Sequence, residues 1–526
     1  MIKKSNFIKN LFYSFILLYL CIGIYLSLNV GITHDESHSF LVWELNKKKL
    51  LNIFFNQNYD VSGLDSYSGF YGIGFYLFSV PIEYLIKIIF NINIIPESGK
   101  LLLIKHPAVF VFFIISGLYL EKIIFFITKN KNYSYLSTVF YLTYPYLLGH
   151  SFFNIKDIPF MSVWLVCTYY LIIVLNNFFT EHKVKKINLI LLALLTAYLF
   201  SIRINGVLIF IQYLIFLIVY LNVFKFNFIK FIRSFYNFII LFSLVFLIFA
   251  YIFYPNFWNS PLKFIDSIKF ASQIPQSVCT LTLGECMKGE NLSSSYLPIW
   301  FFFKLPIFIL SGIILFPFID KKIFSNKENI LSIGSLIITI LTIIFSLILF
   351  NVNLYDELRQ VLFLIPLIFI ISLSTIYFFS KKISFNLLII FIIFFVFQNI
   401  KIFPYNYIWL NNLSTFTKVN NVFELDYWGV STKRVAQYFN QKSSNNDHCI
   451  ISNRNADVKS LMNKKDKCFL PFKNLYKKNS RPFYVALMER RINKGPPNNC
   501  ENIYNEKINI NFTKEDLILA RIFKCN

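Results

Sequence analysis

Residues 11–30 read LFYSFILLYLCIGIYLSLNV, and residues 31–40 read GITHDESHSF. The first segment is twenty residues long and carries no charged side chain, which is the length of a helix that crosses a bilayer. Several lysines precede it, and basic residues flank the cytoplasmic ends of membrane spans. We therefore predict a retained first span with a cytoplasmic N-terminus. This orientation places Asp35 and Glu36 just beyond the extracytoplasmic surface.

The composition agrees with a protein that spans the membrane many times. Of 526 residues, 56% are hydrophobic and only 15% are charged, whereas soluble domains carry about 25% charged residues. The formal net charge of +24 would suggest nucleic acid in a soluble protein. Here the basic residues lie largely in short loops between apolar runs, where they set membrane orientation. We therefore expect the bilayer as a partner and exclude nucleic acid.

The number of spans follows from the charges between the apolar runs. These runs lie at about 70–92, 101–128, 134–149, 158–177, 187–202, 205–221, 235–254, 297–317, 329–350, 360–379 and 384–402. The short basic clusters between them all fall on the cytoplasmic side only if the run 70–92 does not cross. That run is also interrupted by Pro81, Glu83 and Lys87. We predict an all-α polytopic bundle of about eleven transmembrane helices, with 70–92 as a re-entrant or interfacial helix in the first outer loop.

The last part of the chain has a different character. Residues 403–526 are rich in Asn, Lys and Asp, with short apolar runs such as CIIS (449–452) and RPFYVALM (481–488) that are typical of strands. We predict a transmembrane domain at 1–402 and a small extracytoplasmic α/β domain at 403–526, a flexible tail being the alternative. The outer loops of the first domain are then 31–100, 150–157, 255–296 and 351–359.

Most cysteines fall in the segments predicted to lie outside. They are Cys279, Cys286, Cys449, Cys468, Cys500 and Cys525. An even number of cysteines in an oxidising compartment favours disulfides. Proximity in sequence favours Cys279–Cys286, Cys449–Cys468 and Cys500–Cys525, although six cysteines allow many other pairings.

The first two outer loops carry candidate chemistry. Asp35 and Glu36 suit a general base or the ligands of a divalent cation, the alternative being an acidic helix start. The second loop reads HSFFNIKDIPF from His150, so that Lys156 could hold a phosphate while Asp157 orients an acceptor or a metal. An interfacial Lys–Asp anchor pair is the alternative there. If a metal binds at all, Asp35 and Asp157 are its expected ligands.

Arginines at the mouths of later spans suit a lipid-linked phosphate. Arg359 and Gln360 end the stretch NVNLYDELRQ, and Arg203 lies in LFSIRING between two outward helix ends. A guanidinium binds phosphate through two parallel hydrogen bonds, although either arginine could simply extend to the membrane surface. Lys304, in SSSYLPIWFFFKLP, could line a lipid or sugar site or belong to an interfacial aromatic belt.

Taken together, these segments resemble the C-type membrane glycosyltransferases, in particular bacterial relatives of the dolichyl-phosphate-mannose protein mannosyltransferase group (glycosyltransferase family 39-like). The motifs are the acidic pair after the first span, HSFFNIKDIPF, YLPIWFFFKLP, DELRQVLFLIP and FELDYWGVSTKRVAQYFN (423–440), in this order. Two positions depart from the family pattern: Asn154-Ile155 replaces the usual Asn-Pro, and Gln360 stands where many relatives have His.

The resemblance implies a hexosyltransferase that takes its sugar from a polyprenyl-phosphate carrier and transfers it to a lipid, glycan or protein acceptor. Asp35 matches the acceptor-activating base, with Glu36 beside it, and Asp157 matches the acid of the second loop, with Lys156 and His150 alongside. Arg359 is the candidate for the carrier phosphate. No cofactor is required, because phosphate is a good leaving group, and a divalent metal is optional. The expected location is the inner or plasma membrane. The alternative is a transporter or flippase of a lipid-linked or amphiphilic substrate.

Overall fold

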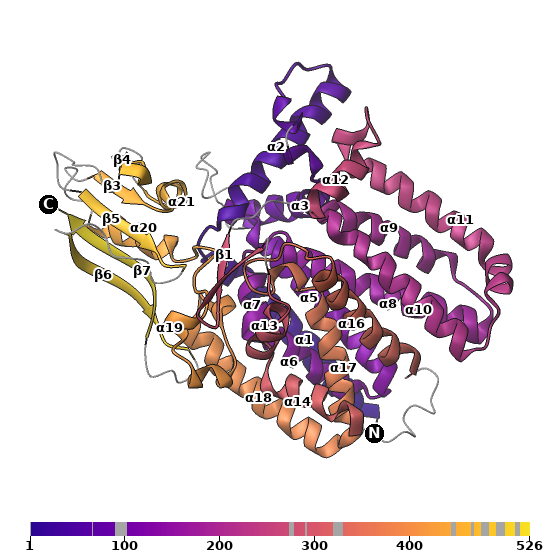
Figure 1. The fold of residues 1–526 in the computed structure, drawn as a ribbon. Helices are drawn as coiled ribbons and strands as arrows, with labels where there is room; N and C mark the ends of the chain where they lie inside the picture. Colours follow the sequence, from indigo (N-terminus) through magenta and orange to yellow (C-terminus); the bar gives the residue numbers. More distant parts are fainter. Residues whose placement is uncertain are drawn as a thin grey trace.

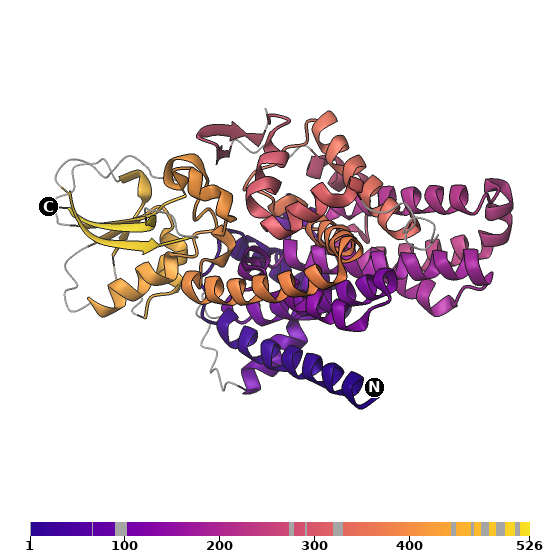
Figure 2. The same ribbon diagram turned by 90° about the horizontal axis from the view of Figure 1, so that it is seen from below.

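The structure is a computed structural model that describes residues 2–65, 67–89, 102–272, 278–289, 292–318, 330–442, 449–463, 468–474, 483–490, 500–510 and 516–525. A large helical body makes up most of it, and a small β-sheet domain projects from one end (Figure 1). On the side away from this domain, α11 (Phe228–Ile252) packs along α9 (Lys186–Ile202) at the edge of the body, and α10 (Ile209–Val223) packs on α16 (Ser335–Leu349) (Figures 1 and 2). These two parts confirm the predicted membrane bundle with a small C-terminal α/β domain.

The body is built from apolar helices. Besides α10 and α11 they are α1 (Ile2–Ser27), α5 (His106–Thr128), α6 (Lys131–Thr143), α8 (Asp157–Glu181), α9 (Lys186–Ile202), α13 (Tyr296–Lys304), α14 (Ile307–Leu315), α16 (Ser335–Leu349), α17 (Leu364–Phe379) and α18 (Lys381–Ile402). Within the described residues, seven helices are long and apolar enough to cross a membrane, or eight if the bent pair α13–α14 is one span. The protein is therefore a multi-pass membrane protein. Counting the shorter α6, α9 and α17 as well would give the predicted eleven, and that number stays a prediction.

Packing separates a central core from helices that face lipid. In the most apolar stretch of α8, 83% of the residues are buried inside the protein, whereas in that of α11 only 6% are buried. Some polar side chains inside the bundle bind one another: Trp164 Nε1 donates to Gln212 Oε1 at 2.7 Å, and Gln212 Nε2 donates to Thr168 Oγ1 at 2.7 Å. These hydrogen bonds join α8 to α10, as expected where no water can satisfy a polar group.

The run 70–92 forms the short helix α3 (Gly74–Ile89), which is not among the candidate spans. One face packs inward, where the buried Glu83 carboxylate binds Lys105 Nζ at 2.7 Å. The other face exposes apolar side chains such as Tyr84 and Ile88. Such a helix is amphipathic and suits the membrane interface, as predicted for this segment.

The C-terminal domain contains a five-stranded sheet in the described residues, with the strand order β4-β3-β5-β7-β6. Its strands are β3 (Cys449–Ser452), β4 (Phe469–Leu470), β5 (Phe483–Met488), β6 (Cys500–Ile508) and β7 (Leu517–Cys525). β3 runs parallel to β4 and β5, whereas β7 is antiparallel to β5 and β6. Apolar side chains of α20 (Thr432–Gln441) and α21 (Asn455–Ser460) pack on one face of the sheet.

Three disulfides are present, and they confirm the pairing that sequence proximity favours. Cys279–Cys286 closes a hairpin formed by β1 (Cys279–Thr282) and β2 (Glu285–Lys288). Cys449–Cys468 and Cys500–Cys525 lie within the C-terminal domain.

The segment around Val430 packs directly on the segment that follows α1. A Cβ atom on Gly31 would overlap the backbone carbonyl oxygen of Val430. We expect Gly31→Ala to lower the free energy of unfolding by about 1–3 kcal/mol, because neither backbone can move away without shifting its neighbours. Thermal unfolding of purified protein would measure it. Gly334→Ala is the matched control, since outside its own helix no atom of the described residues lies within 4 Å of the added Cβ; equal effects of the two substitutions would contradict the packing argument.

Candidate active site

A cavity of about 890 Å³ lies where α2 (His34–Phe55), the loop 350–361 and the C-terminal domain meet. We call it the site cavity. Its wall combines apolar side chains from the helices and their connecting segments with charged side chains from the loops and the C-terminal domain. The apolar group includes Leu208, Phe270, Leu347 and Phe363, and the charged group includes Asp35, Lys156, Arg203, Asp356, Arg359 and Arg490. Such a cavity can accept an amphiphilic molecule with an anionic head.

Asp35 and Arg359 meet on the cavity wall from segments more than 300 residues apart. Asp35 lies in the first turn of α2, with its side chain 28% exposed, and its Oδ2 accepts from Arg359 Nη2 at 2.5 Å. The Arg359 side chain is only 4% exposed, and the Trp428 ring centroid lies 4.2 Å from its guanidinium carbon. The structure thus brings the predicted base and the predicted phosphate ligand into direct contact.

Arg359 also contacts Asp157, which holds a second arginine. Asp157 lies at the start of α8 with its side chain almost fully buried. Its Oδ1 lies 2.5 Å from Arg203 Nη1, and its Oδ2 lies 3.5 Å from Arg359 Nε. Asn154 fixes this carboxylate, since its amide nitrogen donates to Asp157 Oδ2 at 2.9 Å and its oxygen accepts from the Asp157 backbone at 2.9 Å. Asp157 therefore serves to hold two guanidinium groups at the cavity.

Lys156 and Gln360 complete the polar wall. The Lys156 ammonium lies 4.7 Å from the centroid of the Tyr71 ring. Burial lowers the pKa of Lys156, and the neighbouring Asp35 carboxylate opposes this shift. Gln360 lines the cavity, and its buried Oε1 has no hydrogen-bond partner among the described residues.

Glu36 occupies a different environment from Asp35. Its carboxylate accepts from the Thr33 backbone at 2.7 Å and the Thr33 hydroxyl at 2.6 Å, which caps α2. Its second oxygen lies 2.9 Å from His106 Nε2. The side chain is 1% exposed and does not line the site cavity. Its predicted catalytic role remains untested, and its contacts suit the placement of α2.

His150 and Lys304 also lie outside the cavity wall. Burial lowers the pKa of His150 well below its usual range, and its ring nitrogens contact Asn154 and Tyr427. Lys304 forms a fully buried ion pair with Glu357 at 2.8 Å. Both residues therefore lie behind the site, where they support the loops that form it.

The protein is similar to known proteins in its structure but not detectably in its sequence. No family model and no curated protein matches the sequence. Two crystal structures of ArnT from Cupriavidus metallidurans are similar in fold. The one bound to undecaprenyl phosphate has a TM-score of 0.46 and 8% identity, over 98% of this chain and 97% of that chain. The apo structure has a TM-score of 0.47 and 9% identity, over 97% of both chains.

Several cavity residues were missed by the sequence analysis. Trp428, Arg454 and Arg490 reach the site cavity from the C-terminal segment. The segment containing Trp428 was noted for its family resemblance, but Arg490 follows β5 in a stretch without any sequence signal of a site. Their approach depends on how the C-terminal domain docks.

The carboxylates at the cavity bear on whether the site could hold a divalent metal. In the parts of the chain that the structure describes, no group of three or more His, Cys, Asp and Glu side chains is arranged to hold a metal ion. Asp35 and Asp157, the expected ligands, each bind an arginine instead.

The buried pair behind the cavity predicts a pH-dependent stability. Burial raises the pKa of Glu357 to about 7, although Lys304 opposes the shift. Because the folded protein binds this proton more tightly than the unfolded chain, the stabilisation is complete below the carboxyl's usual pKa and is lost as the pH rises through about 7. We expect the thermal midpoint of the purified protein to fall by a few degrees between pH 5 and pH 8.

Glu357→Gln should remove this part of the pH dependence, because the amide is uncharged and does not titrate. Glu44→Gln is the matched control, since Glu44 lies 2.7 Å from Lys47 in a solvent-exposed pair. If the thermal midpoint of Glu357→Gln changed with pH as it does in wild type, Glu357 would not be the titrating group.

Proposed function

We propose that this protein is a membrane glycosyltransferase. It moves a hexose from a polyprenyl-phosphate carrier to an acceptor hydroxyl, on the extracytoplasmic face of the inner or plasma membrane. The observation that carries the proposal is the Asp35–Arg359 contact on the wall of a cavity with both apolar and cationic surfaces. A general base and a phosphate ligand are the two groups that such a transfer needs.

The electrostatics of the cavity favour an anionic donor. Arg359, Arg203 and Lys156 all line it, and guanidinium groups hold phosphate oxygens through paired hydrogen bonds. The apolar side chains nearby, such as Leu208 and Phe363, suit the first isoprene units of the carrier. A water-soluble nucleotide sugar would gain nothing from this apolar wall.

The reaction we propose is a single displacement with inversion. The acceptor oxygen attacks the anomeric carbon, its proton passes to an Asp35 carboxylate oxygen, and the bond from the anomeric carbon to the phosphate oxygen breaks. Polyprenyl phosphate leaves with the electron pair, stabilised by Arg359, Lys156 and Arg203. Asp157 is nearly fully buried between Arg203 and Asn154 and is unsuited to act as a nucleophile, which favours inversion over a covalent intermediate.

Donor binding would also activate the base. The Arg359 guanidinium pairs with Asp35 in the structure, and a carboxylate paired with a cation is in general a weaker proton acceptor than one without such a partner. A donor phosphate competes for the same guanidinium, so that binding releases Asp35 toward the acceptor. This exchange couples proton removal to the presence of the donor.

The extracytoplasmic location is supported by the disulfides. Cys279–Cys286 lies at the site, because the Cys279 carbonyl contacts the cavity residue Arg490. Disulfides form and persist in oxidising compartments.

The test is sugar transfer by purified protein in nanodiscs, with a radiolabelled polyprenyl-phosphate hexose and a panel of lipid, glycan and protein acceptors. We expect labelled acceptor and free polyprenyl phosphate in equal amounts, with the opposite anomeric configuration in the product. Activity should persist in EDTA. Absence of turnover by folded protein with every lipid-linked donor would overturn the proposal and favour the transporter alternative.

A further inference from the structure

The carboxylate of Asp356 is shared between two arginines from different parts of the chain. Its Oδ2 accepts from Arg359 Nη1 at 3.0 Å, and its Oδ1 accepts from Arg490 Nη2. The side chain is 8% exposed, so neither contact is replaced readily by water. Asp356 therefore links Arg359, in the 350–361 loop, to Arg490, in the C-terminal domain.

The backbone at Asp356 needs outside support. Asp356 and Glu357 both have positive φ angles, 58° and 63°, a conformation that non-glycine residues rarely adopt. The Asp356 backbone N–H donates to Thr280 Oγ1 at 2.9 Å, in the disulfide-closed hairpin. Two left-handed residues in succession persist only where the surroundings hold them. The position of the Asp356 carboxylate is thus set by its contacts.

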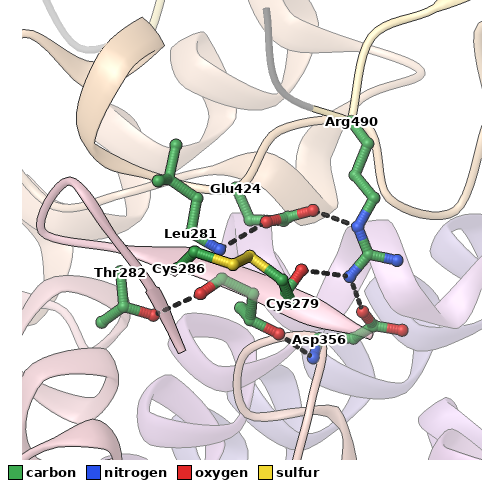
Figure 3. Close-up of a disulfide and its surroundings, with 8 residues drawn as sticks. Cys279, Leu281, Thr282, Cys286, Asp356, Glu424 and Arg490 are labelled. Carbon is green, nitrogen blue, oxygen red and sulfur yellow. Dashed lines mark hydrogen bonds and ion pairs between the residues drawn. A yellow bond between two sulfur atoms is a disulfide. The ribbon is translucent and has the colours of Figure 1, made fainter. Parts of the chain in front are cut away.

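Arg490 is itself held from several sides (Figure 3). Its Nε donates to the fully buried Glu424, and its Nη2 also contacts the Cys279 carbonyl oxygen at 3.5 Å. The other Glu424 oxygen accepts from the Leu281 backbone at 2.6 Å. The hairpin, the segment around Glu424 and the C-terminal domain therefore meet at this one guanidinium.

We propose that Arg490 is a positioning residue that orients Arg359 through Asp356. This inference rests on the proposed function, in which Arg359 holds the donor phosphate. With Arg490 in place, one oxygen of Asp356 is occupied and the other fixes the Nη1 side of Arg359, which leaves Nη2 directed at the cavity where Asp35 now binds it. Without Arg490, the Asp356 carboxylate is free to turn toward Arg359 and to draw its guanidinium away from the donor.

The C-terminal domain thereby becomes part of the donor site. Arg490 itself lines the site cavity, with its side chain 25% exposed. A lysine at this position could contact Asp356 or Glu424 but has no fork with which to hold both. We therefore expect Arg490→Lys to recover only part of what Arg490→Gln loses.

The experiment compares Arg490→Gln and Arg490→Lys with wild type in the nanodisc transfer assay, measuring KM for the donor and kcat separately. Arg490→Gln should raise the donor KM about tenfold or more, since loss of one charge-assisted hydrogen bond is worth about that factor. The acceptor KM should change little. Arg434→Gln is the matched control, because Arg434 belongs to the same domain and lies away from the site cavity.

A double-mutant cycle separates positioning from general stability. In the Asp356→Asn background, Arg490→Gln should cause little further loss, because the group through which it acts is already gone. Additive losses in the double variant, or a wild-type donor KM in Arg490→Gln, would overturn the proposal.

Hydrogen exchange gives a readout that does not depend on turnover. Amides of the 350–361 loop should exchange faster in Arg490→Gln than in wild type or Arg434→Gln. Unchanged exchange there would overturn the positioning role. If wild type shows no transfer at all, the proposed function fails, and the exchange comparison still decides whether Arg490 orders the loop.

Discussion

Replacement of Asp35 by Asn should abolish sugar transfer, with a loss of about 10²–10⁴-fold in kcat. Asn is the same size and keeps an oxygen that can accept from Arg359, so the protein should fold and insert normally. It cannot take up the proton of the acceptor hydroxyl. The measurement is initial rate of polyprenyl phosphate release by Asp35→Asn and wild type at matched protein concentration.

The same substitution also makes a prediction about the affinity for the donor. Because Asp35 competes with the donor phosphate for Arg359, Asp35→Asn should bind polyprenyl phosphate as tightly as wild type or more tightly. Glu44→Gln is the matched control, since Glu44 lies on the same helix and pairs with Lys47. Near-normal turnover in Asp35→Asn would refute the assignment of the base, and a large loss of donor affinity would refute the competition.

Replacement of Arg359 by Gln should reduce both donor affinity and turnover. Arg359 contacts the carboxylates of Asp35, Asp157 and Asp356. We propose that its guanidinium stabilises the negative charge of the departing phosphate. Removing one preorganised donor of this kind costs about 10²–10³-fold in kcat. Equilibrium binding of polyprenyl phosphate and steady-state transfer kinetics would measure the two effects separately.

Stability must be followed in the same variant. Loss of the guanidinium leaves Asp356 with Arg490 and Asp157 with Arg203, so each buried carboxylate keeps one cation. We therefore expect the protein to remain folded, with a lowered thermal midpoint. Arg359→Lys retains the charge without the fork and should recover part of the activity. Full activity in Arg359→Gln would assign the phosphate to Arg203 and Lys156 instead.

The sequence predicted that Asp35 and Glu36 lie at the site, but not which of the two lines the cavity. Both were predicted in the catalytic loop, and adjacent residues on a helix point about 100° apart. That difference directs Asp35 into the site cavity and Glu36 toward His106. Which of the two faces the cavity depends on the rotation of α2 about its axis, and contacts such as Glu36 with His106 and Trp43 with Tyr76 hold that rotation.

Arg203 and Lys304 show the same dependence on packing. The sequence analysis grouped both as candidate ligands, and the structure places Arg203 on the cavity wall beside Asp157. Lys304 instead turns inward to Glu357. A buried ammonium requires a partner, but the sequence alone does not tell which carboxylate supplies it.

The sequence by itself determined the membrane helices and the C-terminal α/β domain, and sequence proximity favoured the three disulfides that the structure contains. The helices follow from local patterns, because a segment in lipid must satisfy its own backbone hydrogen bonds. Only the tertiary structure decided that Arg359 meets Asp35 and that Arg490 reaches Asp356 from the C-terminal domain. Ion pairs between distant segments depend on how helices and domains dock, and docking is set by the packing of the whole molecule.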